Sequence, residues 1–463
     1  MVFPSIEFAI FFCAVLALSW ALMPRQHAWK VFVLVASYAF YGAADWAFCF
    51  LLGGVTLVTQ AGAVLVHRAA SDRARRRLVA ATVAIDLGVL GVFKYYGFFV
   101  EEVNGLLERA SLDLPLPVAA IALPVGISFF TFQAITYVVD VHRRLVPPAG
   151  LLDAAVYLSF FPQLVAGPIV RASEFLPQLA RPRDPARVAV GAGVALIAVG
   201  LVKKVAVADT LARELVDPVF AVPESYAAPD VALAAYGYAA QIYCDFSGYT
   251  DMAIGLALLM GFVFPQNFNR PYRSTSFRAF WRRWHMTLSR FLRDYLYIPL
   301  GGAHGGPWRS ARNVMITMLL GGLWHGAAWG FVLWGGLHGA YLVGERVLRG
   351  RVSAPAWLRW ALVFHGVVLG WVLFRAPDLD IAGTFLSRLA EPGEATLWTA
   401  PVVGLVLVTI GAQLLPERLG PALRARFEAL PSPALGVGLA AVVVLVAATV
   451  PSQGVPPFIY FRF

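Results

Sequence analysis

Long apolar segments alternate with short polar loops along almost the entire chain. A run of about 17–25 apolar residues is long enough to cross a bilayer as a helix. This pattern predicts spans near residues 6–23, 30–45, 47–66, 78–99, 115–140, 188–207, 229–243, 313–333, 334–348, 357–376, 398–415 and 433–451. Two further apolar segments, near 151–169 and 247–264, are interrupted by proline or glycine and polar residues, and we expect them to be re-entrant or irregular. The chain is therefore predicted to be an all-α polytopic membrane protein.

The apolar segments change in character along what we expect to be a single membrane-embedded domain, residues 1–463. Residues 1–150 contain ordinary, peripheral spans, and residues 346–463 return to that pattern. Between about 151 and 345, polar, aromatic and glycine residues enter the apolar segments. Polar and ionisable groups at membrane depth are costly and mark functional sites. We therefore expect the catalytic core in this middle part.

Composition supports a membrane protein and argues against nucleic acid as a partner. The chain is 59% hydrophobic and only 14% charged, although its formal net charge is +10. Basic residues gather in some loops and acidic residues in others: basic near 68–77, 270–312 and 346–351, acidic near 101–102, 214–217 and 378–380. That distribution is typical of positive-inside orientation, with the basic loops in the cytoplasm. Three cysteines provide neither a disulfide framework nor a thiolate metal site, and we expect no metal.

An amphipathic helix is predicted over residues 277–295. At 100° per residue its aromatic and leucine side chains fall within an arc of about 120°, and its arginines fall on the opposite side. Such a helix lies in the membrane interface. His285 falls at the seam between the two faces, with Ser289 beside it. A residue at the membrane–water boundary and a catalytic histidine are both consistent with that position.

His325 lies in a long apolar, glycine-rich stretch that runs to Tyr341 without any Asp, Glu, Lys or Arg. An ionisable group at such depth is a functional-site candidate. An imidazole is also suited to moving protons near neutral pH. The alternative is a single hydrogen bond to a neighbouring helix. His338 lies in a similar glycine-rich segment, and we interpret it as a packing residue because no other polar residue accompanies it.

Other polar residues enter the apolar segments of the middle part and its flanks. Asp245 and Asp251 bracket Ser247 and Tyr249, and a carboxylate there could orient a histidine or pair with an arginine for structure alone. Gln133 is expected either to line a pathway or to hydrogen-bond a neighbouring helix.

Acyl transfer across a bilayer is a reaction that would use a buried histidine in this setting. A thioester donor is cytosolic, and an alcohol acceptor lies outside. Desolvation keeps an imidazole neutral, so that it can accept the proton of the alcohol. Such general-base assistance is typically worth roughly 10²–10⁴ in rate.

Several motifs together resemble the membrane-bound O-acyltransferase family, in its bacterial branch of alginate O-acetyltransferase membrane subunits. They are Asp245–Tyr249, Asn267–Tyr272, Trp281–Ser289, Tyr295–Gly302, Leu323–Gly326 and the C-terminal Pro457–Phe463. The resemblance covers nearly the whole chain. It implies a ring of about 11–13 transmembrane helices, with re-entrant and interfacial helices, around a central funnel or tunnel. It also implies that His325 is the family's buried catalytic histidine and His285 its second motif histidine.

The same resemblance implies a multi-pass protein of the bacterial cytoplasmic (inner) membrane with no bound cofactor. An acyl group, usually acetyl, would come from acetyl-CoA or another cytosolic thioester. A separate extracytoplasmic partner of the serine hydrolase (SGNH) type would then pass it to a polysaccharide. Substrate contacts or tunnel lining are expected from eight side chains: Gln133, Asp245, Ser247, Tyr249, Asn269, Trp281, Ser289 and Trp324. Alternatives are a D-alanyl transferase of the teichoic-acid type, a transporter or channel, and a structural scaffold.

Overall fold

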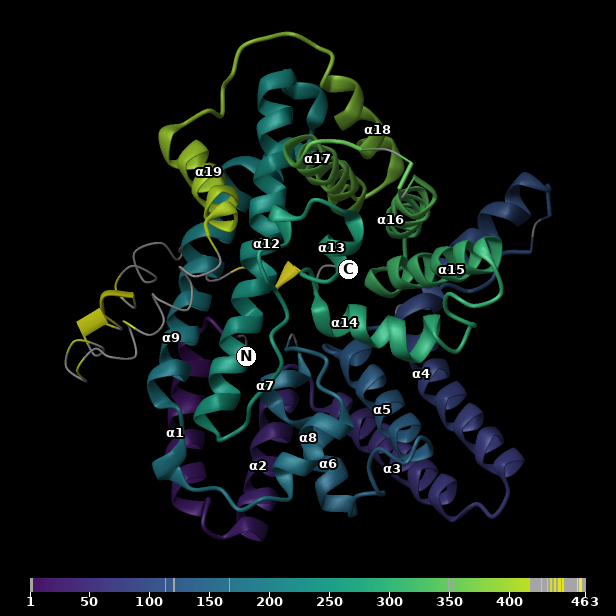
Figure 1. The fold of residues 1–463 in the computed structure, drawn as a ribbon, viewed down its shortest axis with the longest axis vertical. Helices are drawn as coiled ribbons and strands as arrows, with labels where there is room; N and C mark the ends of the chain where they lie inside the picture. Colours follow the sequence, from purple (N-terminus) through teal and green to yellow (C-terminus); the bar gives the residue numbers. More distant parts are fainter. Residues whose placement is uncertain are drawn as a thin grey trace. The chain divides into compact units, whose positions relative to one another are not determined.

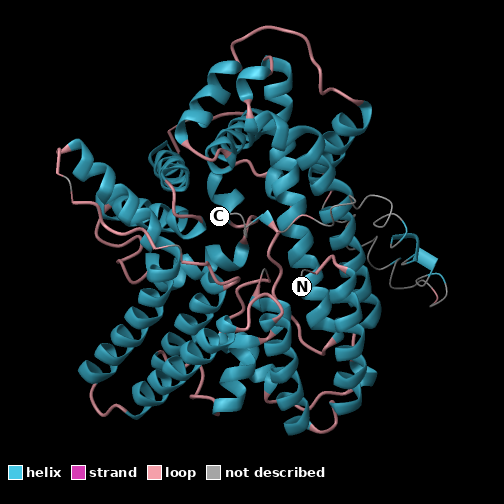
Figure 2. Ribbon diagram, turned by 180° about the vertical axis from the view of Figure 1, so that it is seen from behind, coloured by secondary structure: helices cyan, strands magenta, loops and turns pink. Residues whose placement is uncertain are grey.

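The computed structural model describes residues 3–416 except 113, 120, 166, 349 and 352, and beyond them isolated positions that include 458 and 459. Every regular element within these residues is helical (Figures 1 and 2). Four described helical segments are long and apolar enough to cross a membrane: α3 (Ala47–Arg68), α4 (Asp72–Arg109), the continuous run Val190–Ala221 and α17 (Ala356–Arg375). Shorter apolar helices are α1 (Ile6–Leu22) and α19 (Ala400–Leu414). The prediction of an all-α membrane protein is confirmed.

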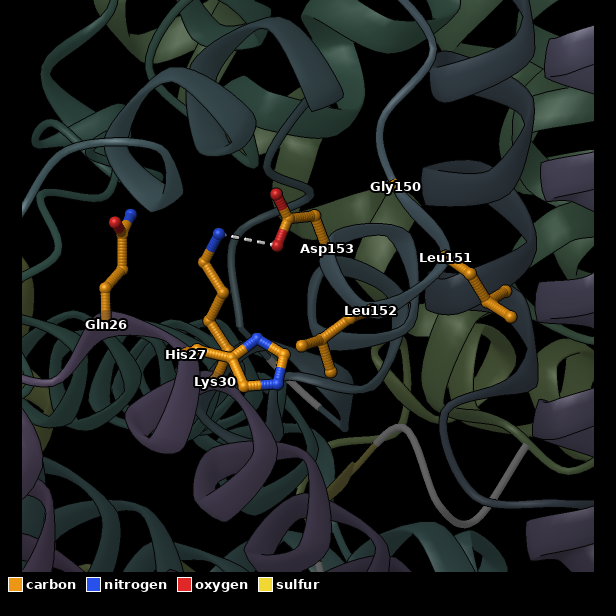
Figure 3. A pocket seen from close by; sticks show the side chains of 7 residues that line it. All are labelled: Gln26, His27, Lys30, Gly150, Leu151, Leu152 and Asp153. Atoms are coloured by element: carbon orange, nitrogen blue, oxygen red, sulfur yellow. Dashed lines mark ion pairs between the residues drawn. The ribbon is translucent and has the colours of Figure 1, made fainter.

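The chain divides into two compact units, and the first consists of Met1–Ala189 with Leu256–Phe264. In addition to α1, α3 and α4 it contains α2 (Gln26–Gly42), α5 (Ile127–His142), α6 (Leu151–Ser159), α7 (Phe161–Leu164), α8 (Ala172–Leu179) and η1 (Pro185–Arg187). Helix α3 packs against α4 and α5, and α2 packs against α6. A recess of about 370 Å³ lies between α2 and the start of α6, where Lys30 and Asp153 form an ion pair of 2.7 Å (Figure 3). None of the predicted site residues lines this recess.

The second unit consists of Val190–Gly255 with Pro265–Phe463. It begins with the run α9 (Val190–Leu201), η2 (Val202–Ala208), α10 (Asp209–Leu211), η3 (Ala212–Val216), α11 (Asp217–Ala221) and η4 (Pro223–Ser225). After α12 (Ala228–Leu259) come η5 (Pro271–Arg273), α13 (Phe277–Trp281), α14 (Met286–Phe291), η6 (Leu292–Tyr297), α15 (Pro307–His325), α16 (Trp329–Leu348), α17, α18 (Leu379–Arg388) and α19. Helix α16 packs against both α15 and α17.

The predicted span over 115–140 is wrong in its first half. Helix α5 begins only at Ile127, and the described residues between 115 and 126 form no helix. Pro115, Pro117 and Pro124 explain the difference. Proline lacks a backbone N–H and disfavours helical geometry in the residue before it.

The segment 247–264 is not broken where its polar and glycine residues suggested. It joins the preceding span in one helix, α12, of 32 residues. Gly248 lies inside that helix because it allows close approach of a neighbour: a β-carbon there would lie 2.8 Å from the carbonyl oxygen of Gly200. The segment 151–169, by contrast, is irregular as predicted, since α6 and α7 are short and separated at Phe160. The predicted span 433–451 lies outside the described residues, apart from isolated positions.

The continuous amphipathic helix over 277–295 is also wrong. Helix α13 ends at Trp281 and α14 begins at Met286. Between them the chain pairs with the preceding loop: Asn269 N–H donates to Arg283 O (2.9 Å), and Met286 N–H donates to Asn267 O (2.9 Å). These bonds replace helical ones, so the 100° count does not hold across the turn. The His285 side chain does not lie on an exposed seam of a helix, because it is completely buried.

Candidate active site

His325 is the last residue of α15, and it is buried, with 3% of its surface exposed. The helix ends here because Gly326 takes an extended conformation, which lets the Phe331 ring pack where a β-carbon of Gly326 would stand. Aromatic rings enclose the imidazole. Ring centroids of Trp324, Trp334 and Phe374 lie 5.0, 5.1 and 5.2 Å from that of His325.

His285 occupies the turn between α13 and α14 in a left-handed backbone conformation, with φ of 41°. Non-glycine residues rarely adopt this conformation, and at functional sites such strain is retained because the surrounding structure enforces it. The Phe246 ring of α12 meets the imidazole edge-to-face, with centroids 4.6 Å apart. The strained turn thus directs a fully buried imidazole toward α12.

Asn267 holds the His285 turn. Its side-chain oxygen lies 3.2 Å from His285 Nδ1 and accepts hydrogen bonds from the Thr287 N–H and hydroxyl at 3.1 and 2.9 Å. All three residues are buried. An amide oxygen is an acceptor, so it favours the tautomer of His285 with the proton on Nδ1. Nε2 of His285, which forms no hydrogen bond to a described residue, is then the acceptor nitrogen.

The two histidines belong to one enclosure. Their ring centroids lie 6.5 Å apart, and the Trp324 ring lies 6.1 Å from that of His285 and next to His325. They are 40 positions apart in sequence and come from different elements. The structure thus brings together His285, His325 and Trp324, three of the predicted site residues.

Asp245 is used for structure, not to orient a histidine. Its Oδ1 pairs with Lys204 Nζ at 2.6 Å, and the same ammonium pairs with Asp209 at 2.6 Å. Its Oδ2 accepts a hydrogen bond from the backbone N–H of Ile459 at 3.1 Å. Lys204 is only 2% exposed. Of the two alternatives for this carboxylate, the structural pairing is the observed one, but the partner is a lysine and not the expected arginine. Similarly, Asp251 pairs with Lys203 at 2.6 Å.

Tyr249 and Ser247 are buried on the same helix as Asp245. The Tyr249 ring lies 4.5 Å from that of Phe458, which in turn lies 5.4 Å from the Phe246 ring that contacts His285. Phe458 and Ile459, near the end of the chain, therefore pack on the segment of α12 that supports the site.

The remaining predicted residues lie on α13, on α14, in the loop before η5 and, in the first unit, on α5. Trp281 is buried at the end of α13, with its ring 5.7 Å from that of Trp334. Ser289 on α14 donates to the carbonyl of Trp284 at 3.3 Å, and Asn269 is exposed. Gln133 is completely buried on α5 and belongs to the first unit. A tunnel-lining role for these residues stays a prediction.

Sequence reasoning did not assign three residues that shape the site: Lys204, Asn267 and Trp334. A signal existed for Lys204, since a lysine within an apolar run requires a partner. Asn267 was visible only as the first residue of the Asn267–Tyr272 motif, and Trp334 as one of several tryptophans. Their roles depend on contacts between distant segments.

Replacement of Asn267 by alanine is expected to destabilise the protein by about 1–3 kcal/mol, because buried Thr287 and His285 donors lose their acceptor. Asn269→Ala is the matched control, and a surface change of this kind is expected within about 0.5 kcal/mol. Thermal unfolding of both purified proteins in detergent tests this. Equal stability of the two variants would contradict the role given to Asn267.

Residues 121–374, more than half of the chain, match the family described as MBOAT, membrane-bound O-acyltransferase. The matched range contains His285, His325 and Asn267. The chain belongs to this family and is an O-acyltransferase of the membrane. The family assignment favours the enzyme over the transporter and the scaffold that the sequence alone left open.

Relatives with assigned names extend the match over most of the chain. It is 42% identical to the probable alginate O-acetylase AlgI of Pseudomonas aeruginosa, over 88% of this chain and 80% of that protein. It is 40% identical to the probable alginate O-acetylase AlgI of Azotobacter vinelandii, over 86% and 79%. It is 35% identical to the peptidoglycan O-acetyltransferase of Helicobacter pylori, over 76% and 72%.

Proposed function

We propose that this O-acyltransferase takes an acetyl group from a cytosolic thioester and passes it across the membrane for O-acetylation of an extracytoplasmic polysaccharide. The observation that carries the proposal is the pair of buried histidines, 6.5 Å apart in one aromatic enclosure. The names of the relatives, an alginate O-acetylase and a peptidoglycan O-acetyltransferase, support acetyl as the group and a glycan as the final acceptor.

His325 is proposed as the proton acceptor. As an alcohol oxygen attacks the thioester carbonyl, a C–O bond forms and the C–S bond breaks. The imidazole takes the hydroxyl proton and returns it to the departing thiolate. An enclosure that excludes water favours the neutral imidazole needed for this step. His285, oriented by Asn267, is proposed to hold the reacting groups beside it.

Acetyl-CoA is the proposed donor, and no bound cofactor is required. The alcohol that receives the acetyl group is proposed to belong to a separate extracytoplasmic protein of the serine hydrolase type, which modifies the glycan. Alginate is the proposed polysaccharide, on the strength of the relatives' names. We also propose that the chain is a multi-pass protein of the cytoplasmic membrane, and its apolar helices support a membrane location.

Donor choice tests this proposal. Membranes that contain the protein, its extracytoplasmic partner and alginate would receive either acetyl-labelled acetyl-CoA or a carrier protein charged with labelled D-alanine. We expect label in the alginate only from acetyl-CoA, and none from membranes that lack the protein. Transfer from the D-alanyl carrier alone would contradict the proposal and favour the teichoic-acid alternative.

A further inference from the structure

His338 lies on α16 in the second unit, and its fully buried side chain is surrounded by aromatic rings. Its ring centroid lies 4.8 Å from Trp334, 5.3 Å from Trp281, 5.8 Å from Tyr341 and 6.0 Å from Phe280. These surroundings would suit a phenylalanine equally well by shape. A histidine at this position therefore indicates that its polar ring nitrogens have a role.

The ring nitrogens around His338 are buried and form no hydrogen bonds within the described part of the chain. Neither nitrogen of His338, nor the indole nitrogen of Trp334, forms a hydrogen bond with a described residue. Each buried polar group left in this state costs about 1–3 kcal/mol. Such groups in a native structure indicate a function or a weaker polar contact. The rings of His338 and Trp334 meet at 60°, the edge-to-face arrangement in which ring hydrogens of one partner face the π-system of the other.

Gly370 on α17 packs against the rings of His338 and Trp334. A β-carbon at this position would lie 3.1 Å from His338 Nε2 and 3.5 Å from the indole nitrogen of Trp334. Both nitrogens thus face the same point on the α17 backbone. Because glycine has no side chain there, α17 packs directly against the His338–Trp334 pair.

Trp334 connects this pair to the site. Its indole contacts His325 at 90°, with centroids 5.1 Å apart, so the orientation of one ring limits that of the other. We propose that His338 is a positioning residue for the acyl transfer: it fixes the Trp334 indole, which sets the orientation of the His325 imidazole. This inference rests on the proposed role of His325. It replaces the interpretation of His338 as a packing residue.

Two replacements of His338 separate positioning from packing. His338→Phe keeps the ring and removes both nitrogens, whereas His338→Gln keeps a polar group and loses the ring. With the purified protein, we expect kcat for acetyl transfer from acetyl-CoA to fall at least about tenfold in His338→Phe, with KM for the donor within about twofold. His338→Gln should retain more of kcat than His338→Phe. If His338 only fills space, His338→Phe should retain more of kcat than His338→Gln. That result, or a wild-type kcat in His338→Phe, would overturn the inference.

The route through Trp334 is tested by a double-mutant cycle. If His338 acts through the indole, His338→Phe should lower kcat much less in a Trp334→Phe background than in the wild type. Equal losses in both backgrounds would overturn that route. His365→Phe, at an exposed histidine of α17, is the control and should keep the wild-type kcat.

The variants His325→Ala and His338→Phe together distinguish a wrong role for His338 from a wrong role for His325. If His325→Ala is inactive while His338→Phe has the wild-type kcat, only the inference on His338 is overturned. If His325→Ala is active, the proposed role of His325 falls and the inference falls with it. Should both His338 variants fail to fold, Gly370→Ala displaces the same two rings. It is expected to lower kcat without changing KM, and a wild-type kcat would overturn the inference.

Discussion

His325→Ala is expected to remove glycan acetylation in cells while the protein still folds and inserts. Loss of general-base assistance alone predicts a decrease of roughly 10²–10⁴ in rate. The expected decrease is large because the neighbouring Trp324, Trp334 and Phe374 rings have no basic group that could accept the proton in place of the imidazole. Acetyl content of the extracted polysaccharide, normalised to the amount of protein in the membrane, measures the effect.

His304→Ala is the matched control for this experiment, because His304 lies exposed in the loop before α15. It should leave acetylation unchanged. Normal acetylation in His325→Ala cells would remove this histidine from the mechanism. A loss that merely follows a reduced amount of protein would assign His325 to folding.

Lys204→Met is expected to produce the largest loss of stability, about 3–5 kcal/mol. The substitution leaves two buried carboxylates, Asp209 and Asp245, without the ammonium that now lies 2.6 Å from each. Asp245 also anchors the backbone of Ile459, so the packing of that segment on α12 should weaken as well. Thermal unfolding and size-exclusion profiles of the detergent-purified protein measure the change.

Two further variants identify the cause of that loss. Lys203→Met breaks the Lys203–Asp251 ion pair, whose side chains are 25% and 22% exposed. This variant should lower the stability much less than Lys204→Met. Combining Lys204→Met with Asp209→Asn and Asp245→Asn removes all three charges and should recover part of the stability. Wild-type stability in Lys204→Met would contradict the account of this triad.

The features that depend on local composition were predictable from the sequence. Apolar run length predicted the long apolar helices, and an uncharged stretch around an ionisable residue predicted that His325 is buried. Errors arose where an apolar run contained residues with special backbone behaviour. Three prolines displaced the start of α5, whereas Gly248 permitted close packing inside α12 without interrupting it.

The supporting residues of the site were not predictable, because they act across the chain. Asn267 contacts His285 from 18 positions away. Its backbone carbonyl also accepts a hydrogen bond from the Met286 N–H, in place of a bond of the expected helix. Lys204 meets Asp245 from 41 positions away. Hydrophobic periodicity predicts which face of a single helix is buried. It does not predict which polar residue of another helix contacts that face.

Acetyl transfer by the purified protein is the direct test of His325 as the proton acceptor. Proteoliposomes containing the wild type, His285→Ala or His325→Ala would receive acetyl-labelled acetyl-CoA outside and the acceptor partner inside. In a single turnover, the wild type should transfer label, His285→Ala should transfer it more slowly, and His325→Ala should transfer none above empty liposomes. Transfer by His325→Ala at a rate within a few-fold of the wild type would contradict the claim that this buried imidazole accepts the proton when the ester forms.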